Sequence, residues 1–174
     1  MTEGHVFIAA SLDGFIARAD DGLDWLLAFR DGDDDHGYGA FMAGMDGVVM
    51  GRGTWEVCRG FDPWPFAVPV VMMSRSLRAE DVPPGLRGRV RVSGEAPRAV
   101  MEGLGWRRAY VDGGAVIRSF LAEGLIAEVT LTRAPVILGA GRPLFGAGPE
   151  IALEHRETRS WPSGLVQSRY RVVR

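Results

Sequence analysis

The sequence predicts an α/β fold, a three-layer domain with a mostly parallel central sheet and an antiparallel edge at its C-terminal end. Apolar, strand-like runs alternate with helical segments through most of the chain, which is the pattern of parallel strands joined by crossover helices. The last two strand-like runs follow one another without a helix between them, as antiparallel strands do. The length of 174 residues and the 47% share of hydrophobic residues suit one domain that spans residues 1–174.

The first half of the chain predicts three strands and three short helices. Apolar runs place the strands at 5–10, 48–50 and 68–73, and helices are expected at 24–29, 36–43 and 54–59. The Asp-Gly pair within residues 11–14 predicts a turn after the first strand. The acidic run at 31–35 is typical of a solvated loop.

The second half continues the alternation and then changes to strands alone. Strands are expected at 89–92, 109–111 and 127–133, and helices at 97–104 and 115–123. Gly139 and Gly141 are followed by Pro143 and by no helix, so this stretch is expected to be a hairpin turn. Residues 151–155 and 165–173 lie close enough along the chain to form an antiparallel hairpin.

The composition excludes several classes of protein. A formal net charge of −2 argues against a nucleic-acid-binding protein. The basic residues are all arginine, so lysine chemistry such as Schiff-base formation is excluded. The single cysteine, Cys58, excludes an internal disulfide, and with three histidines no metal site is expected. No apolar run is long enough to span a membrane and the N-terminus lacks the basic start of a signal peptide, so we expect a cytoplasmic protein.

Three strand ends carry residues that suit a phosphate ligand. Glycine-rich turns at 51–54 and 113–115 lead from a strand into a helix, where free backbone amides favour an anion. A third strand ends in Ser74, Arg75 and Ser76. Each glycine turn alone is also explained as a tight turn, but parallel strands end at one edge, so the set predicts a ligand with several phosphates. No GxGxxG follows the first strand, so an ordinary Rossmann fold is not indicated.

Five segments, taken in order, resemble a known superfamily. They are residues 9–17 (AASLDGFIA), 49–55 (VMGRGTW), 74–76 (SRS), 111–114 (VDGG) and 135–145 (PVILGAGRPLF). Together they resemble the dihydrofolate reductase-like superfamily and look closest to the branch that contains the reductase domain of bacterial riboflavin biosynthesis, the RibD C-terminal domain. The resemblance covers nearly the whole chain.

The resemblance implies NADPH as cofactor. Ala10 and Ile16 are expected beside the nicotinamide, and the two glycine turns are expected to hold the pyrophosphate. The 74–76 loop is expected to flank the adenosine, and Arg52 to reach the 2′-phosphate, with Arg75 pointing either to that phosphate or to solvent. The implied cofactor-binding residues are Ala10, Ile16, Gly51, Arg52, Gly53, Thr54, Ser74, Arg75, Ser76, Gly113, Gly114 and Ala115. Gly114→Val is expected to lose the cofactor before it loses stability.

Two aspartates are candidates for the catalytic end of the site. Asp24 is the nearest match to the carboxylate that binds the pterin in true dihydrofolate reductases, and a helix cap is its alternative role. Asp13 lies near the cofactor's reactive end by resemblance, and a simple Asp-Gly turn is its alternative. We take Asp24 as the candidate proton donor, or the residue that holds a donor water.

The resemblance implies an NADPH-dependent reductase of a small heterocyclic or sugar-phosphate substrate, similar to the riboflavin-biosynthesis pyrimidine reductase. The chain lacks the cysteines of the zinc deaminase often fused to that enzyme, so a stand-alone reductase domain is expected. A true dihydrofolate reductase and a non-catalytic nucleotide-binding protein remain alternatives. A homodimer is also expected, because the strand at 165–173 is too rich in valine for an exposed edge.

Overall fold

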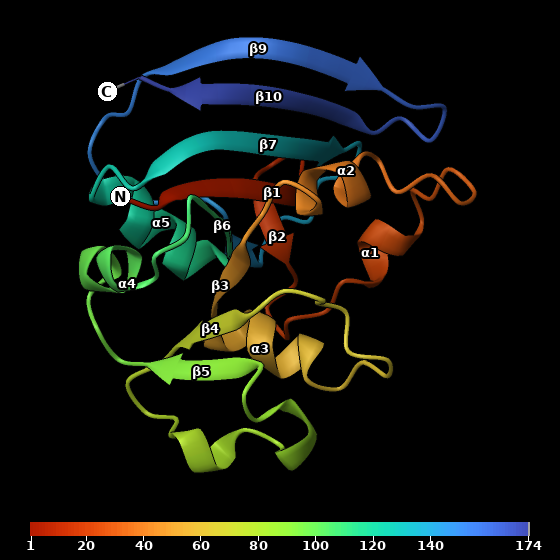
Figure 1. Cartoon of the computed structure of the whole chain (residues 1–174). Coiled ribbons are helices and arrows are strands. Elements are labelled where there is room, and N and C mark those ends of the chain that lie inside the picture. The colour runs from red at the N-terminus through yellow and green to blue at the C-terminus, as the bar shows by residue number, and fades with distance from the viewer. Residues whose placement is uncertain (174) are drawn as a thin grey trace.

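The computed structural model describes residues 1–173. Its centre is an eight-stranded sheet with the strand order β5-β4-β3-β6-β1-β7-β10-β9 (Figure 1). The strands are β1 (Glu3–Ser11), β3 (Gly47–Gly51), β4 (Val70–Met73), β5 (Val90–Ser93), β6 (Arg108–Asp112), β7 (Ile126–Ala134), β9 (Leu153–Ser160) and β10 (Val166–Val172). The pairs from β5 to β7 are parallel, and β10 pairs antiparallel with β7 and β9. The predicted α/β fold with an antiparallel C-terminal edge is confirmed.

Helices cover both faces of the sheet and make the outer two layers. They are α1 (Asp24–Leu27), α2 (Tyr38–Met42), α3 (Arg52–Cys58), α4 (Pro97–Gly103) and α5 (Gly114–Ala122), with short 3-10 turns at Ala79–Asp81 and Pro84–Leu86 between β4 and β5. In Figure 1, α4 and α5 lie together at the left of the sheet and α1 and α2 at its right. None of the helices among residues 1–173 is long and apolar enough to cross a membrane.

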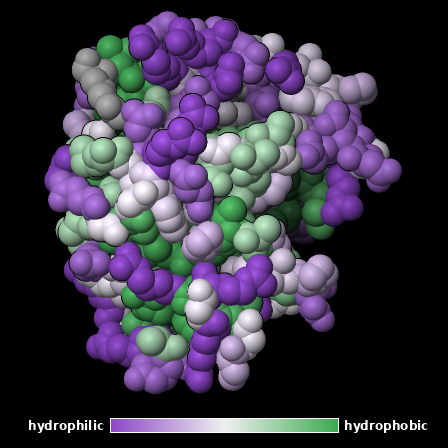
Figure 2. Space-filling model, in the orientation of Figure 1, coloured by the Kyte–Doolittle hydropathy of each residue, from purple (hydrophilic) through white to green (hydrophobic). Residues whose placement is uncertain are grey.

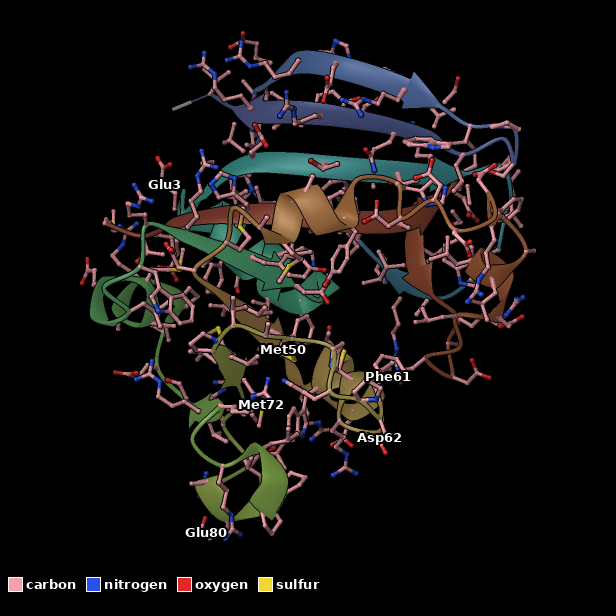
Figure 3. The ribbon with its side chains drawn as sticks, turned by 45° about the vertical axis from the view of Figure 1, so that its right-hand side comes forward. Glu3, Met50, Phe61, Asp62, Met72 and Glu80 are labelled. Carbon is pink, nitrogen blue, oxygen red and sulfur yellow. The ribbon has the colours of Figure 1, made fainter. Side chains whose placement is uncertain are left out.

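The alternation of side chains along the strands produces two main cores. Val49 and Val111 pack with Ile117 and Phe120 of α5 on one face. Met50 and Met72 pack with Trp55 of α3 on the other face, and Figure 3 shows these two methionines in the interior beside α3. Each fully buried side chain of this size contributes about 1.5–3 kcal/mol of burial free energy, so both faces need their helical layer.

A small second sheet was not predicted. β2 (Phe15–Ala17) pairs antiparallel with β8 (Arg142–Pro143). Gly141 precedes β8, and a Cβ there would collide with the carbonyl oxygen of Ala17. The glycine-rich stretch at 139–141 is therefore a turn, as expected, but it leads into this two-stranded sheet.

The C-terminal strand lies inside the sheet, which corrects the premise of the homodimer prediction. β10 is covered on both sides by β7 and β9 of the same chain. The edge strand is β9, whose sequence is LEHRETRS, and charged side chains of this kind protect an edge from pairing with other chains. The valines of β10 therefore give no reason to expect a partner at that position.

Candidate functional site

Four neighbouring strands end at one edge of the sheet. β4, β3, β6 and β1 are consecutive and parallel. Met50 of β3 pairs with Met72 on one side and with Asp112 on the other, so the loops after these strands start at the same level. The structure therefore brings together the loops 51–54, 74–76 and 113–115, at the edge where open α/β sheets bind ligands.

The two glycine turns touch each other. Gly113 has a φ of +95°, which favours glycine, and a Cβ at this position would lie 2.9 Å from Oγ1 of Thr54. Its amide N–H is occupied, because it donates a 2.9 Å hydrogen bond to the carboxylate of Asp112. The amides free to meet an anion are therefore those of the first turns of α3 and α5, which have no partner within their own helix.

Gly53 and Gly114 differ in what surrounds them. A Cβ on Gly53 would meet nothing within 4 Å, so the backbone of α3 is open there. A Cβ on Gly114 would lie 2.9 Å from the carbonyl oxygen of Pro143 and 3.1 Å from Cδ1 of Ile16. Ile16 of β2 and Pro143 of β8 therefore occupy the space that a side chain at position 114 would need. The expectation that Gly114→Val keeps its stability is corrected on this ground.

Arg52 faces the loop that follows β4. Its guanidinium donates to Oγ of Ser76 at 3.5 Å, and the hydroxyls of Ser74 and Ser76 lie 3.3 Å apart. Arg75 is exposed, and its side chain forms no hydrogen bond or ion pair with residues 1–173. A cavity of about 330 Å³ adjoins this loop, lined by Ser74, Arg75, Leu77, Arg78, Ala79, Val92 and Gly94. Arg78 is a cation that the sequence reasoning did not single out.

Asp112 is a functional candidate that the sequence reasoning missed. It ends β6 immediately before the glycine turn, where the sequence reads VDGG. Burial raises the pKa of its carboxyl to about 6, although hydrogen bonds with Gly113, Tyr110 and Thr54 act in the opposite direction. A carboxylic acid that titrates near neutral pH beside a candidate ligand site is suited to proton transfer.

Tyr110 couples this acid to the sheet. Its hydroxyl lies 3.1 Å from the carbonyl oxygen of Phe7 and also hydrogen-bonds with the carboxyl of Asp112. A hydrogen bond donated by the phenol to the carboxylate favours the charged form and lowers the pKa of Asp112. Tyr110 therefore stabilises the ionised form of the acid.

Tyr38 stands on the same face of the sheet. Its ring packs edge-on against Phe7 and Tyr110, with centroid distances of 5.7 and 6.3 Å. Burial, and then the charge of Asp112, raises the pKa of Tyr38 to about 12. Its hydroxyl forms no hydrogen bond with residues 1–173, so it is available to a ligand. The same two causes raise the pKa of the nearby Cys58 thiol to about 11, which excludes a reactive thiolate.

The two predicted catalytic aspartates are engaged in local contacts. Asp24 is exposed and receives two hydrogen bonds from Arg18, at 2.8 and 2.9 Å, and this pairing lowers its pKa. Asp13 accepts hydrogen bonds from Oγ of Ser11 at 2.6 Å and from the amides of Leu138 and Gly139, and these bonds lower its pKa. Neither is bonded to the three strand-end loops among residues 1–173, and their proposed catalytic roles stay predictions.

The acidic run is partly ordered by the C-terminal hairpin. Asp31 is half-buried and accepts hydrogen bonds from Ser163 and, at 2.9 Å, from the ring of His36. Asp34 accepts a bond from the indole of Trp161 at 2.9 Å. Residues 32–35 are exposed, as predicted for a solvated loop. The contacts with the hairpin hold the segment before α2 in place, and so position Tyr38.

Comparisons with known proteins match nearly the whole chain. The model of the RibD C-terminal domain family matches residues 4–166. The uncharacterized protein YwjB of Bacillus subtilis (strain 168) is 33% identical over 147 residues, which cover 80% of either chain. The crystal structure of a putative riboflavin biosynthesis protein from Shewanella sp. PV-4 is 36% identical, with a TM-score of 0.90, and the match covers 99% of this chain and 100% of that one.

A more distant match shows the shared fold alone. It is a diaminohydroxyphosphoribosylaminopyrimidine deaminase/5-amino-6-(5-phosphoribosylamino)uracil reductase from Thermotoga maritima, 14% identical with a TM-score of 0.73. The match covers 99% of this chain and 57% of that chain.

Proposed function

The chain belongs to the RibD C-terminal domain family, and from this premise we propose that it is an NADPH-dependent reductase of a small heterocyclic or sugar-phosphate compound. The observation that carries the proposal is the convergence of three phosphate-suited loops at one sheet edge, with Arg52 of one loop directed at Ser76 of another. A ligand with phosphates at two separate points fits this arrangement, because amides and guanidinium groups face the same edge.

The residues around this edge fit a dinucleotide. The open backbone at Gly53 leaves room for a pyrophosphate at the first turn of α3. We assign Arg52 and Ser76, which are hydrogen-bonded to each other, to the 2′-phosphate, and Arg75 and Arg78 line the neighbouring cavity. We assign Ala10, buried near the end of β1, and Ile16 of β2, whose side chain lies beside Gly114, to the nicotinamide. The bound cofactor would supply the hydride.

The chain's own residues then have to orient the substrate and supply a proton. We assign the proton to Asp112, because its pKa of about 6 keeps a usable fraction protonated in neutral solution. Once Asp112 has given up its proton, the hydrogen bond with Tyr110 stabilises the carboxylate, and solvent water supplies the proton that restores the acid. The hydroxyl of Tyr38, free of partners among residues 1–173, is assigned to substrate orientation. Asp24 remains a second candidate for the proton, which Arg18 would have to release first.

The test is an NADPH oxidation assay with a panel of acceptors. The panel contains 5-amino-6-(5-phosphoribosylamino)uracil, its unphosphorylated form, dihydrofolate and several quinones, and NADPH binding is titrated separately by tryptophan fluorescence. We expect NADPH to bind and at least one heterocycle to be reduced. Turnover of dihydrofolate alone would identify a dihydrofolate reductase. Binding of NADPH without turnover of any acceptor would favour the non-catalytic alternative, and no binding of NADPH would refute the proposal.

A further inference from the structure

We infer that the substrate end of this site takes an unphosphorylated heterocycle, neutral or positively charged, and selects against a phosphorylated one. The inference rests on the proposed reductase function and concerns the substrate only. Three observations support the inference. Acidic residues border the substrate end, the arginines near it are already bound by other groups of the chain, and apolar side chains lie close to it.

The substrate end lies on the face of the sheet that carries α1, α2 and α3. Tyr38 of α2 interacts electrostatically with Asp112 there. Its ring lies 5.7 Å from that of Phe7 and 6.3 Å from that of Tyr110, and Phe41 packs against these two rings at 5.0 and 5.2 Å. A flat ring is the ligand that aromatic side chains of this kind favour. The carboxyl of Asp112 adds a negative charge above pH 6, and the Tyr38 hydroxyl adds a neutral hydrogen-bonding group.

The segment that borders this end is strongly acidic. Residues 18–36 join β2 to α2 and include seven aspartates against two arginines. The aspartates are Asp20, Asp21, Asp24, Asp31, Asp33, Asp34 and Asp35. Asp21 and Asp24 are paired with arginines, so a phosphate group brought to this segment would meet repulsion from the other five aspartates, whereas a neutral or positively charged ring would not.

The cations at this end are already bound within the chain. Arg18 is held by Asp24 at 2.8 and 2.9 Å, and Arg142 of β8 is held by Asp21 at 2.8 and 3.3 Å. Arg118 of α5, on the other face of the sheet, donates to the carbonyl oxygens of Pro143 and Leu144 at 2.6 and 3.2 Å, so it is engaged as well. Arg30 is exposed, and it is the one arginine of residues 18–36 for which the described part of the chain provides no partner.

The cofactor end has the opposite character. The side chain of Arg75 has no acidic partner among residues 1–173, and Arg52 contacts only the hydroxyl of Ser76. Phosphate recognition is therefore concentrated where the cofactor is proposed to bind. The Thermotoga maritima protein is named for a uracil that carries a phosphoribosylamino group, and a site for such a substrate needs a free cation or a set of donors for its phosphate.

Two exposed apolar side chains lie beside the turn that follows β1. Leu12 follows β1, and its amide donates to the carbonyl oxygen of Val136 at 2.8 Å, which places Leu12 beside the loop that contains Ile137. The two side chains are 57% and 69% exposed. Figure 2 shows hydrophobic residues across the middle of the molecular face, between more hydrophilic regions above and below. Exposed apolar side chains next to a site favour an uncharged ligand.

The test is calorimetric titration of the full chain, with and without saturating NADPH, using two matched probes. The probes are 5-amino-6-(5-phosphoribosylamino)uracil and the same compound without its phosphate. We expect the unphosphorylated probe to bind at least ten-fold more tightly, which corresponds to about 1.4 kcal/mol. Equal binding, tighter binding of the phosphorylated probe, or no binding of either probe would overturn the inference. Because the titration needs no turnover, this outcome is separate from the NADPH oxidation that tests the reductase function.

Charge variants test the cause of the preference. Asp21→Asn with Asp24→Asn releases Arg142 and Arg18, so we expect affinity for the phosphorylated probe to rise at least about five-fold at low salt and less at high salt. Glu102→Gln with Glu150→Gln makes the same change in charge at two exposed positions in α4 and in the loop before β9, and should leave both affinities unchanged. Arg30→Ala provides a further check. We expect this variant to leave the affinity for the phosphorylated probe unchanged. A clear loss of that affinity would identify Arg30 as a phosphate ligand and would overturn the inference.

Discussion

Asp112 is the residue on which the proposed chemistry depends most. It combines a half-buried position at the end of β6 with a pKa raised to about 6. Its type and place were visible in the sequence, but its burial was not, because burial comes from α2, α3 and the neighbouring strands. The sequence thus supplied the VDGG motif, and only the fold shows that the aspartate in it is a perturbed acid.

Substituting Asp112 should affect turnover much more than cofactor binding. We expect Asp112→Asn to lower kcat by about 10²-fold or more, the usual contribution of a positioned acid, while the NADPH affinity changes less than about two-fold. In the unmodified protein kcat should fall as pH rises through about 6, because the protonated form is the donor. This limb of the pH profile should be missing in Asp112→Asn and present in the control Asp62→Asn, whose aspartate is exposed in the loop after α3 (Figure 3). An unchanged limb in Asp112→Asn would assign the proton to another group.

Asp112 should also make stability depend on pH. A carboxyl whose folded pKa of about 6 exceeds the ordinary aspartate pKa of about 3.9 binds protons better in the folded state, so the free energy of unfolding falls as pH rises between these values. Relative to Asp112→Asn, the unmodified chain should lose about 1–3 kcal/mol between pH 4 and pH 7. Urea unfolding at both pH values measures this difference. A constant difference would mean that the pKa of Asp112 is not raised.

Arg52 tests the choice between cofactors. An arginine contact to phosphate contributes about 1.5–3 kcal/mol, and the exposure of Arg52 should hold it near the lower value. We expect Arg52→Ala to weaken NADPH binding about ten-fold and to leave the affinity for NADH nearly unchanged. Adding Arg75→Ala should further reduce the difference between the affinities for the two cofactors. Fluorescence titration of both cofactors measures this. Equal losses for NADPH and NADH would place Arg52 at the pyrophosphate instead.

At the scale of elements, the first turn of α3 offers a cleaner test of the phosphate cradle than Gly114 does. Gly53→Ala adds a Cβ that meets no protein atom within 4 Å, and alanine favours a helix over glycine by about 1 kcal/mol. We expect this variant to be at least as stable as the unmodified chain and to bind NADPH several-fold more weakly. Gly103→Ala, at the end of α4 with equally open surroundings, is the matched control. Normal NADPH affinity in a stable Gly53→Ala protein would show that the ligand does not approach α3 there.

Most elements could be predicted from the sequence, for physical reasons that also explain the exceptions. The buried strands at 48–50 and 109–111 and the helix after Gly113 have clear apolar patterns, and the structure places β3, β6 and α5 there. β2 and β8 are three and two residues long and too short for any periodicity. The pairing of Asp24 with Arg18 depends on a turn between them, which the sequence does not specify.

At the scale of the whole molecule, the homodimer stays a prediction, but β10 no longer supports it. A surface that suits a partner is the cavity of about 310 Å³ beside α5, which is lined by Phe145 and Leu153 among others. These two side chains are 47% and 44% exposed. Exposed apolar patches on monomeric proteins are usually small, so an apolar surface of this kind suits coverage by a partner. We propose that it forms the contact between the two copies of the chain.

Sedimentation velocity tests the homodimer directly. We expect about twice the chain mass at micromolar concentration, and we expect Phe145→Arg with Leu153→Arg to shift the protein to monomer, because two buried charges would oppose association. Thr158→Arg, on exposed β9, is the control for added charge. A monomer in the unmodified protein would refute the homodimer, and a dimer that persists in the double variant would place its contact elsewhere.

The central claim is that the three strand-end loops bind NADPH, and the most direct measurement is titration of NADPH and NADH into the unmodified chain. Arg52, Arg75, Ser76 and the open first turn of α3 lie at this edge, and an aspartate or glutamate placed to read a ribose diol is missing from residues 51–54 and 74–76. We predict that both cofactors bind and that NADPH binds about ten-fold more tightly or better, with the difference decreasing at high salt. Equal affinities, or no binding of NADPH, would contradict the account.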